Sequence, residues 1–146
     1  MKTTLADKYK FLFLLMISLI FLSLQKDKND LLWNESRPLT WDDFKGKPEK
    51  RFAAASTHYD ILKSISKENS GATVKIEAVF FTNASWKKVS WINDEVLAHE
   101  QKHFDIVELY ARKLRKALSE QTFKTYSELE NKLNKLYDKY DKEMDL

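Results

Sequence analysis

The stretch Glu95-Val96-Leu97-Ala98-His99-Glu100-Gln101-Lys102-His103-Phe104-Asp105-Ile106 decides how the rest of the chain is interpreted. It lies within residues 94–118, which contain no Gly or Pro and are rich in the helix formers Glu, Leu, Ala, Lys and Arg. Apolar residues recur there with the period of a helix, so we predict one long amphipathic helix. Its inward face is expected to hold Val96, His99, Glu100, His103, Val107, Tyr110 and Leu114.

The spacing of His99, Glu100 and His103 indicates a metal site. On a helix the two histidines lie one turn, about 5.4 Å, apart on the same face, where two imidazoles can hold one ion. We expect them in the middle of the buried face, with Glu100 close enough to reach a water molecule on the ion. In zinc peptidases with this spacing the metal lowers the pKa of its water toward about 7, and the glutamate takes the proton. The plainer interpretation is two core histidines beside a solvated glutamate.

Composition narrows the classes of function. The charges are interspersed, the formal net charge is +3, and no basic patch is interleaved with aromatic residues. We therefore expect no nucleic-acid partner. The chain contains no cysteine, which excludes disulfides, zinc ribbons, thiol catalysis and a lipid-modified N-terminal cysteine. A zinc site must then use histidine and carboxylate ligands.

The N-terminus is typical of an exported protein. Three lysines within residues 2–10 precede an apolar run at 11–24, which suits a signal peptide better than a full membrane span. Small residues for cleavage are missing, so an uncleaved anchor is the alternative. We predict a signal peptide or membrane-anchor helix at 1–25, a linker at 26–38 and one domain at 39–146. The protein is then expected in the cell envelope, membrane-anchored, secreted or periplasmic.

Two strands are expected before the long helix. Residues 51–61 contain few turn formers, and residues 73–81 alternate between apolar and polar side chains. The polar stretch 67–71 between them predicts an antiparallel pair. Upstream, Thr40 and Asp43 match a capping-box pattern, and the aromatic side chains at 41 and 44 are expected to pack into the core.

A second amphipathic helix is predicted at the C-terminus. Its apolar residues recur at helical spacing, and its other face is charged. These apolar residues are Leu129, Leu133, Leu136, Tyr140 and Met144. The predicted fold class is α+β, with a small antiparallel sheet covered by the motif helix and the C-terminal helix.

Three parts of the sequence together resemble a known family: residues 39–48 (LTWDDFKGKP), Ser85-Trp86, and residues 99–116, which begin HEQKHFDIVELYARK. The chain resembles the bacterial domain-of-unknown-function family 922 (DUF922), described as predicted secreted zinc-dependent proteases. The resemblance implies export, a zinc ion and a zincin-like layout, with His99 and His103 as metal ligands and Glu100 as the general base. It also implies a further histidine after residues 140–143, where this sequence has Leu146 and stops.

The third zinc ligand is left open by the sequence. Catalytic zinc sites usually have three protein ligands and one open position. Glu108 lies about 140° round the helix from His103, so we expect it to point away and to pair with Arg112 or with a neighbouring element. The remaining candidates are His58 on the first predicted strand, and Glu128 and Glu130 at the start of the last helix.

The sequence thus predicts an exported or membrane-anchored zinc-dependent hydrolase. A peptidase is the simplest form, with Glu100 activating a zinc-bound water against a peptide or protein substrate. We expect an edge strand near Val74–Phe81 to hold an extended substrate by strand addition. The alternative is a non-catalytic envelope module that keeps the fold after losing the third zinc ligand.

Overall fold

The structure is a computed structural model that describes residues 29–68 and 71–144. The predicted leader at 1–25 lies outside these residues. None of the helices in the described part of the chain combines the length and apolar character needed to span a bilayer.

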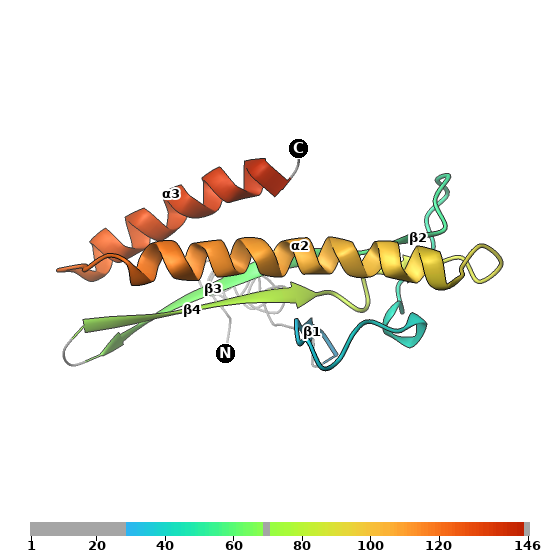
Figure 1. The fold of residues 1–146 in the computed structure, drawn as a ribbon, viewed down its shortest axis with the longest axis horizontal. Coiled ribbons are helices and arrows are strands. Elements are labelled where there is room, and N and C mark those ends of the chain that lie inside the picture. Colours follow the sequence, from blue (N-terminus) through green and yellow to red (C-terminus); the bar gives the residue numbers. More distant parts are fainter. Residues whose placement is uncertain (1–28, 69–70, 145–146) are drawn as a thin grey trace, which may run out of the picture.

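A long antiparallel hairpin forms the centre of the fold (Figure 1). Strand β3 spans Tyr59–Glu68 and strand β4 spans Gly71–Phe80, and they pair along their whole length. The short strand β1, Leu31–Leu32, adds to the other side of β4 at Val79 and Phe80. The strand order is therefore β1-β4-β3, with β4 in the middle.

A second, two-stranded sheet lies at one end of the hairpin. It joins β2, Ala55–Ser56, to β5, Trp86–Lys87, in antiparallel register. Gly46 bridges Trp86 on the other side, and its N–H donates to the Ser85 carbonyl at 2.7 Å. The chain approaches itself closely here, since a Cβ on Gly46 would lie 2.8 Å from the Ser85 carbonyl oxygen.

Helix α2 spans Asp94–Ser119 and lies along the hairpin (Figure 1). Asn93 caps its start, because the Asn93 side chain accepts a hydrogen bond from the Val96 N–H at 2.9 Å. The absence of Gly and Pro lets the helix continue for 26 residues. Its buried residues are Glu100, Phe104, Val107, Glu108, Ala111, Leu114 and Leu118.

Helix α3 spans Tyr126–Met144 and turns back beside α2 (Figure 1). The Thr125 hydroxyl accepts the Glu128 N–H at 3.2 Å and so caps its first turn. Near its other end, the Tyr110 hydroxyl of α2 donates to the Glu143 carbonyl at 3.2 Å. The predicted apolar face packs on the core, with Leu129 and Leu133 fully buried.

The core lies between the hairpin and the two helices. Phe80 on β4 is fully buried, and its ring centroid lies 5.1 Å from Phe44 and 5.8 Å from Phe104. Burying an aromatic side chain of this size contributes about 1.5–3 kcal/mol. The other buried members of the cluster are Leu39, Ile61, Ile76, Ala78, Val107, Ala111, Leu114, Leu118, Leu129 and Leu133.

The segment before the hairpin is fixed by a polar contact to α2 and by an ion pair within the segment itself. The Trp33 indole N–H donates to Asp105 Oδ1 at 2.8 Å, and Arg37 pairs with Asp43 at 2.6 Å. Burial alone would raise the pKa of the Asp43 carboxyl, but hydrogen bonds from Arg37 and Thr40 outweigh it and lower that pKa. The predicted linker at 26–38 thus contributes β1 and this ion pair to the folded unit.

Most of the predicted elements are confirmed. The fold is α+β, with small antiparallel sheets and two helices, and the Thr40–Asp43 capping box forms at the 3-10 helix η1, Trp41–Asp43. The prediction of one strand at 51–61 is wrong, because residues 51–54 form a loop and β3 instead runs on to Glu68. The edge-strand prediction is also wrong for residues 79–80, where β1 covers β4.

Candidate metal centre

His99 and His103 point their ring nitrogens at each other. Their Nε2 atoms are 3.0 Å apart, and the rings are nearly perpendicular, with an interplanar angle of 89°. Two nitrogens at 2.0–2.1 Å from a tetrahedral zinc ion are about 3.3–3.4 Å apart. A shift of a few tenths of an ångström would therefore fit an ion between them. The same separation also suits a hydrogen bond between the two rings.

We predicted the histidines in the middle of the buried face of α2, but they lie at its edge. His99 is exposed and His103 is half-buried, whereas Glu100 is buried. At about 100° per residue, the buried residues centre on the direction of Glu100, with His103 about 60° and His99 about 100° away from it. The face of α2 that carries Phe104 and Val107 packs against the sheet. Both imidazoles therefore lie at the border between the buried and the exposed face of the helix.

The Glu100 carboxylate is held by a hydroxyl from the sheet side. Only 6% of Glu100 is exposed, and its Oε2 accepts a hydrogen bond from the Thr57 Oγ1 at 2.6 Å. Thr57 lies between β2 and β3, so the connection of the two sheets positions the glutamate of α2. A buried carboxylate requires such a donor, because leaving it without one would cost about 1–3 kcal/mol or more.

The three motif residues line one cavity of about 460 Å³ between α2 and the β2 region. Its other lining residues are Arg51, Ala53, Ala54, Ala55, Ser56, Thr57, Tyr59 and Val96. The run of small side chains at 53–56 leaves room next to the imidazoles. A ligand in this cavity can meet the ring nitrogens of the histidines and the Glu100 carboxylate at the same time.

His58 does not reach the histidine pair. Its neighbours Thr57 and Tyr59 both line the cavity, and successive side chains of an extended chain point to opposite sides. The His58 N–H donates to Ser85 Oγ at 2.9 Å, and its buried Nε2 has no hydrogen-bond partner among the residues that the structure describes. The proposal of His58 as a zinc ligand is therefore not supported by its position.

Glu128 and Glu130 are also far from the histidine pair. They lie at the start of α3, beyond the C-terminal end of α2, and His103 to Ser119 alone spans about 24 Å of helix. Glu128 accepts the Lys124 N–H at 2.8 Å. Across residues 29–68 and 71–144, no three His, Cys, Asp or Glu side chains are grouped so that they could hold a metal ion.

Glu108 points away from the cavity, as we predicted. Its Oε1 accepts hydrogen bonds from Arg112 at 2.8 Å and from Arg115 at 2.5 Å. Arg115 also donates to the Ile76 carbonyl of β4 at 2.8 Å. Glu108 thus anchors α2 to the sheet.

The sequence analysis did not identify the cavity residues that precede β3, among them Thr57 and Arg51. Thr57 could have been found from strand alternation around His58, since it falls on the opposite side of the chain. Arg51 gave no signal in the sequence, because its position depends on tertiary contacts: it donates to Ser56 Oγ at 2.6 Å and lies 5.1 Å from the Trp86 ring centroid.

The fold and the cavity together define an α+β protein whose long helix carries two converging imidazoles beside a buried glutamate. The chain belongs to DUF922, a family of bacterial proteins of unknown function, whose family model matches residues 39–146. No curated protein and no solved structure matches the chain. Membership confirms the predicted family, and the zinc-protease description stays a prediction.

Proposed function

We propose that this protein is a zinc-dependent hydrolase of the cell envelope, most simply a peptidase. One observation carries the proposal: the Nε2 atoms of His99 and His103 converge to 3.0 Å beside a cavity that Glu100 also lines. Two imidazole ligands and a carboxylate that is not a ligand are the groups that one helix contributes to a hydrolytic zinc site.

His99 and His103 would hold the ion, and Glu100 would act as the general base. Bound zinc supplies a water of lowered pKa and polarises a carbonyl group. The Thr57 hydroxyl donates to Glu100 Oε2, which leaves Oε1 available to accept the proton. The hydrogen bond keeps the carboxylate in one orientation, which is what a general base requires before the substrate arrives.

The substrate would lie along β2 and not along β4, which is paired on both sides at residues 79–80. β2 pairs with β5 in a two-stranded sheet, and its other edge has no strand partner in the described part of the chain. An extended peptide can add to such an edge through backbone hydrogen bonds. Residues 53–57 line the cavity, so a peptide on β2 would run beside the histidine pair.

One observation favours the alternative of a non-catalytic module. The described residues supply two imidazoles but no third ligand, and catalytic zinc sites usually have three. A protein that keeps the histidine pair without hydrolytic activity would have the same fold and the same cavity. The two functions differ in zinc content and turnover.

The test is metal analysis of the purified full chain after equilibration with zinc. We expect close to one zinc per chain, lost in His99→Ala and retained in the distant control Glu128→Gln. Hydrolysis of a mixed fluorogenic peptide library should then be lost in Glu100→Gln while zinc is retained. A zinc content below one per chain that His99→Ala leaves unchanged would rule out the proposed metal site. Zinc binding without hydrolysis would support the alternative of a non-catalytic module.

A further inference from the structure

The end of the molecule at which α2 begins exposes three large apolar side chains. Phe52 is 96% exposed, Val89 78% and Trp91 45%. The Phe52 and Trp91 rings contact each other edge-on, with centroids 5.3 Å apart. We call these three residues the apolar tip. Single exposed apolar residues are ordinary, but a contiguous group marks an interaction surface.

The apolar tip is built from two loops that hold each other. Val89 lies in a tight turn closed by the hydrogen bond from the Trp91 N–H to the Lys88 carbonyl at 2.9 Å. The Lys88 ammonium lies 4.6 Å from the Trp91 ring centroid and donates to the Arg51 carbonyl, next to Phe52. The loops are thus joined at the tip, which presents its apolar residues together.

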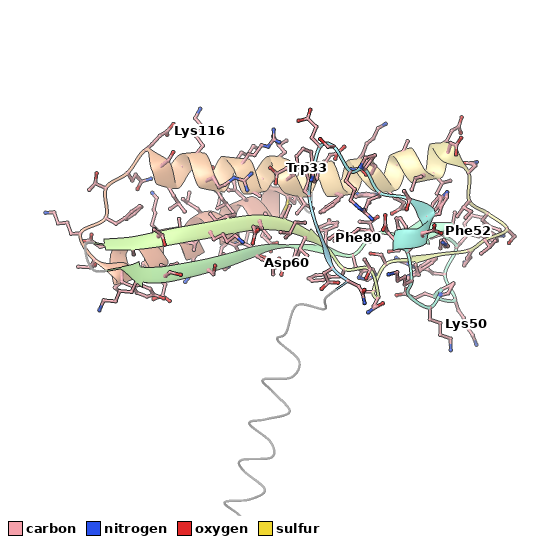
Figure 2. All side chains as sticks on the ribbon, turned by 90° about the horizontal axis from the view of Figure 1, so that it is seen from below. Trp33, Lys50, Phe52, Asp60, Phe80 and Lys116 are labelled. Atoms are coloured by element: carbon pink, nitrogen blue, oxygen red, sulfur yellow. The ribbon has the colours of Figure 1, made fainter. Side chains whose placement is uncertain are left out.

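Basic residues flank the apolar tip in the sequence. Residues 45–52 and 86–91 carry six lysines and arginines and one acidic residue, Glu49. Glu49 pairs with Arg51 at 3.1 Å, and the acidic Asp94 and Glu95 at the start of α2 offset only part of the remaining charge. Figure 2 shows Phe52 and Lys50 at the same end of the molecule, away from Lys116. The basic members are Lys45, Lys47, Lys50, Arg51, Lys87 and Lys88.

We propose that the apolar tip and its flanking basic residues dock on an anionic membrane surface. Aromatic rings and short apolar loops insert at the level of the lipid headgroups, while lysines and arginines beside them attract anionic lipids. The tip projects from loops into solvent and is not a groove, which suits a soft planar surface better than a folded protein partner.

Docking in this way would bring the cavity close to the membrane. Arg51 and Ala53 both line the cavity, and they flank Phe52 in the sequence. The membrane contact does not depend on zinc or on hydrolysis, so it can be tested separately from the proposed function.

The chain has no cysteine, so a single introduced cysteine can carry an environment-sensitive fluorophore. We would label Phe52→Cys and Val89→Cys in the full chain, with Leu109→Cys as the matched control, because Leu109 is 51% exposed on α2. Each protein is mixed with vesicles of phosphatidylcholine alone or with added phosphatidylglycerol. We expect a blue shift and at least a twofold rise in emission at positions 52 and 89 on anionic vesicles only. Adding Lys47→Glu and Lys50→Glu, both at exposed positions, should weaken the change several-fold.

The control position separates the apolar tip from the N-terminal segment. If the protein attached to vesicles through residues 1–25 alone, the emission of the labels at positions 52, 89 and 109 would not change. That result would overturn the proposal. Equal changes at all three positions would indicate aggregation on the vesicle, and a change at 52 and 89 without vesicles would indicate self-association. A response that is the same on neutral vesicles, or that ignores the two charge reversals, would exclude an anionic surface as the partner.

Discussion

The hydroxyl of Thr57 donates to the Glu100 carboxylate at 2.6 Å, although the two residues are 43 positions apart. This contact links the connection between β2 and β3 to the helix that carries both histidines. It sets the direction of the one motif side chain that is buried, while the two imidazoles remain at the rim of the cavity.

Thr57→Val should impair the proposed reaction more than it impairs folding. Loss of a hydrogen-bond donor beside a reacting group typically costs about 10–100-fold. We expect a fall of that size in kcat with little change in KM, measured on a peptide that the wild-type protein cleaves. Thr57→Ser keeps the hydroxyl and should restore most of the activity. Equal loss in both variants would assign Thr57 a packing role only.

Zinc should stabilise the folded protein through the histidine pair. A ligand that binds the folded state alone adds about 2.7 kcal/mol at a concentration of 100 Kd. We expect the melting temperature to rise with zinc and to fall back with a chelator in the wild type and in Glu128→Gln. In His103→Ala the melting temperature should not respond to either. A wild-type melt indifferent to chelator would contradict the metal site.

Gly46→Ala should destabilise the small sheet. The added Cβ would lie 2.8 Å from the Ser85 carbonyl oxygen and 2.9 Å from that of Asn83, and both are backbone atoms that cannot rotate away. Overpacking of this kind costs about 1–3 kcal/mol. Urea denaturation should show this loss, and Lys45→Ala at the exposed neighbouring position should change stability by less than about 0.5 kcal/mol.

Asp43 should contribute stability at neutral pH that is lost in acid. Its folded-state pKa lies below its ordinary value, because hydrogen bonds from Arg37 and Thr40 outweigh the effect of burial. A lowered pKa stabilises the folded state above the unfolded pKa of about 3.9 and ceases to do so as the pH falls through the folded value. Asp43→Asn should therefore cost about 1–2 kcal/mol at pH 7. The difference from the wild type should shrink below about pH 4, and urea denaturation of both proteins from pH 7 to 3 would show it.

Tyr137 should make the protein less stable in alkali. Burial raises the pKa of its hydroxyl, and the hydrogen bond to Asp60 Oδ1 at 2.8 Å raises it further. A raised pKa contributes stability that is complete below the unfolded value of about 10 and is lost as the pH rises above it. Urea denaturation from pH 8 to 11 should show a steeper decline for the wild type than for Tyr137→Phe. Tyr126→Phe, at an exposed position, should follow the wild type.

The sequence predicted the period of α2 correctly and its rotation incorrectly. The spacing of apolar residues predicts a helix regardless of what the helix packs against. Which face of the helix is buried depends on which side chains fit against the sheet. Val96 and Tyr110 are only half-buried, and counting them as core moved the predicted face toward the histidines. The difference matters for the site, because a histidine at the rim can reach a ligand and a histidine in the core cannot.

The strands were also predicted correctly in part. Alternation in β4 predicted its core face correctly, and Ile76, Ala78 and Phe80 are buried. The extension of β3 through Lys67 and Glu68 was missed because those polar side chains resemble a loop. Backbone pairing with Ala72 and Gly71 holds them in the strand regardless of side-chain polarity. The cavity itself depends on contacts between distant segments, which no local pattern contains.

The pairing of β1 with β4 has a mechanical consequence for the predicted membrane segment. Leu31 and Leu32 are hydrogen-bonded into the sheet, so only residues 25–30 separate the apolar run at 11–24 from the folded unit. Six residues reach at most about 20 Å even when fully extended. With the leader kept in a bilayer, the start of β1 would stay within that distance of the lipid, and the whole domain would be confined to the membrane surface.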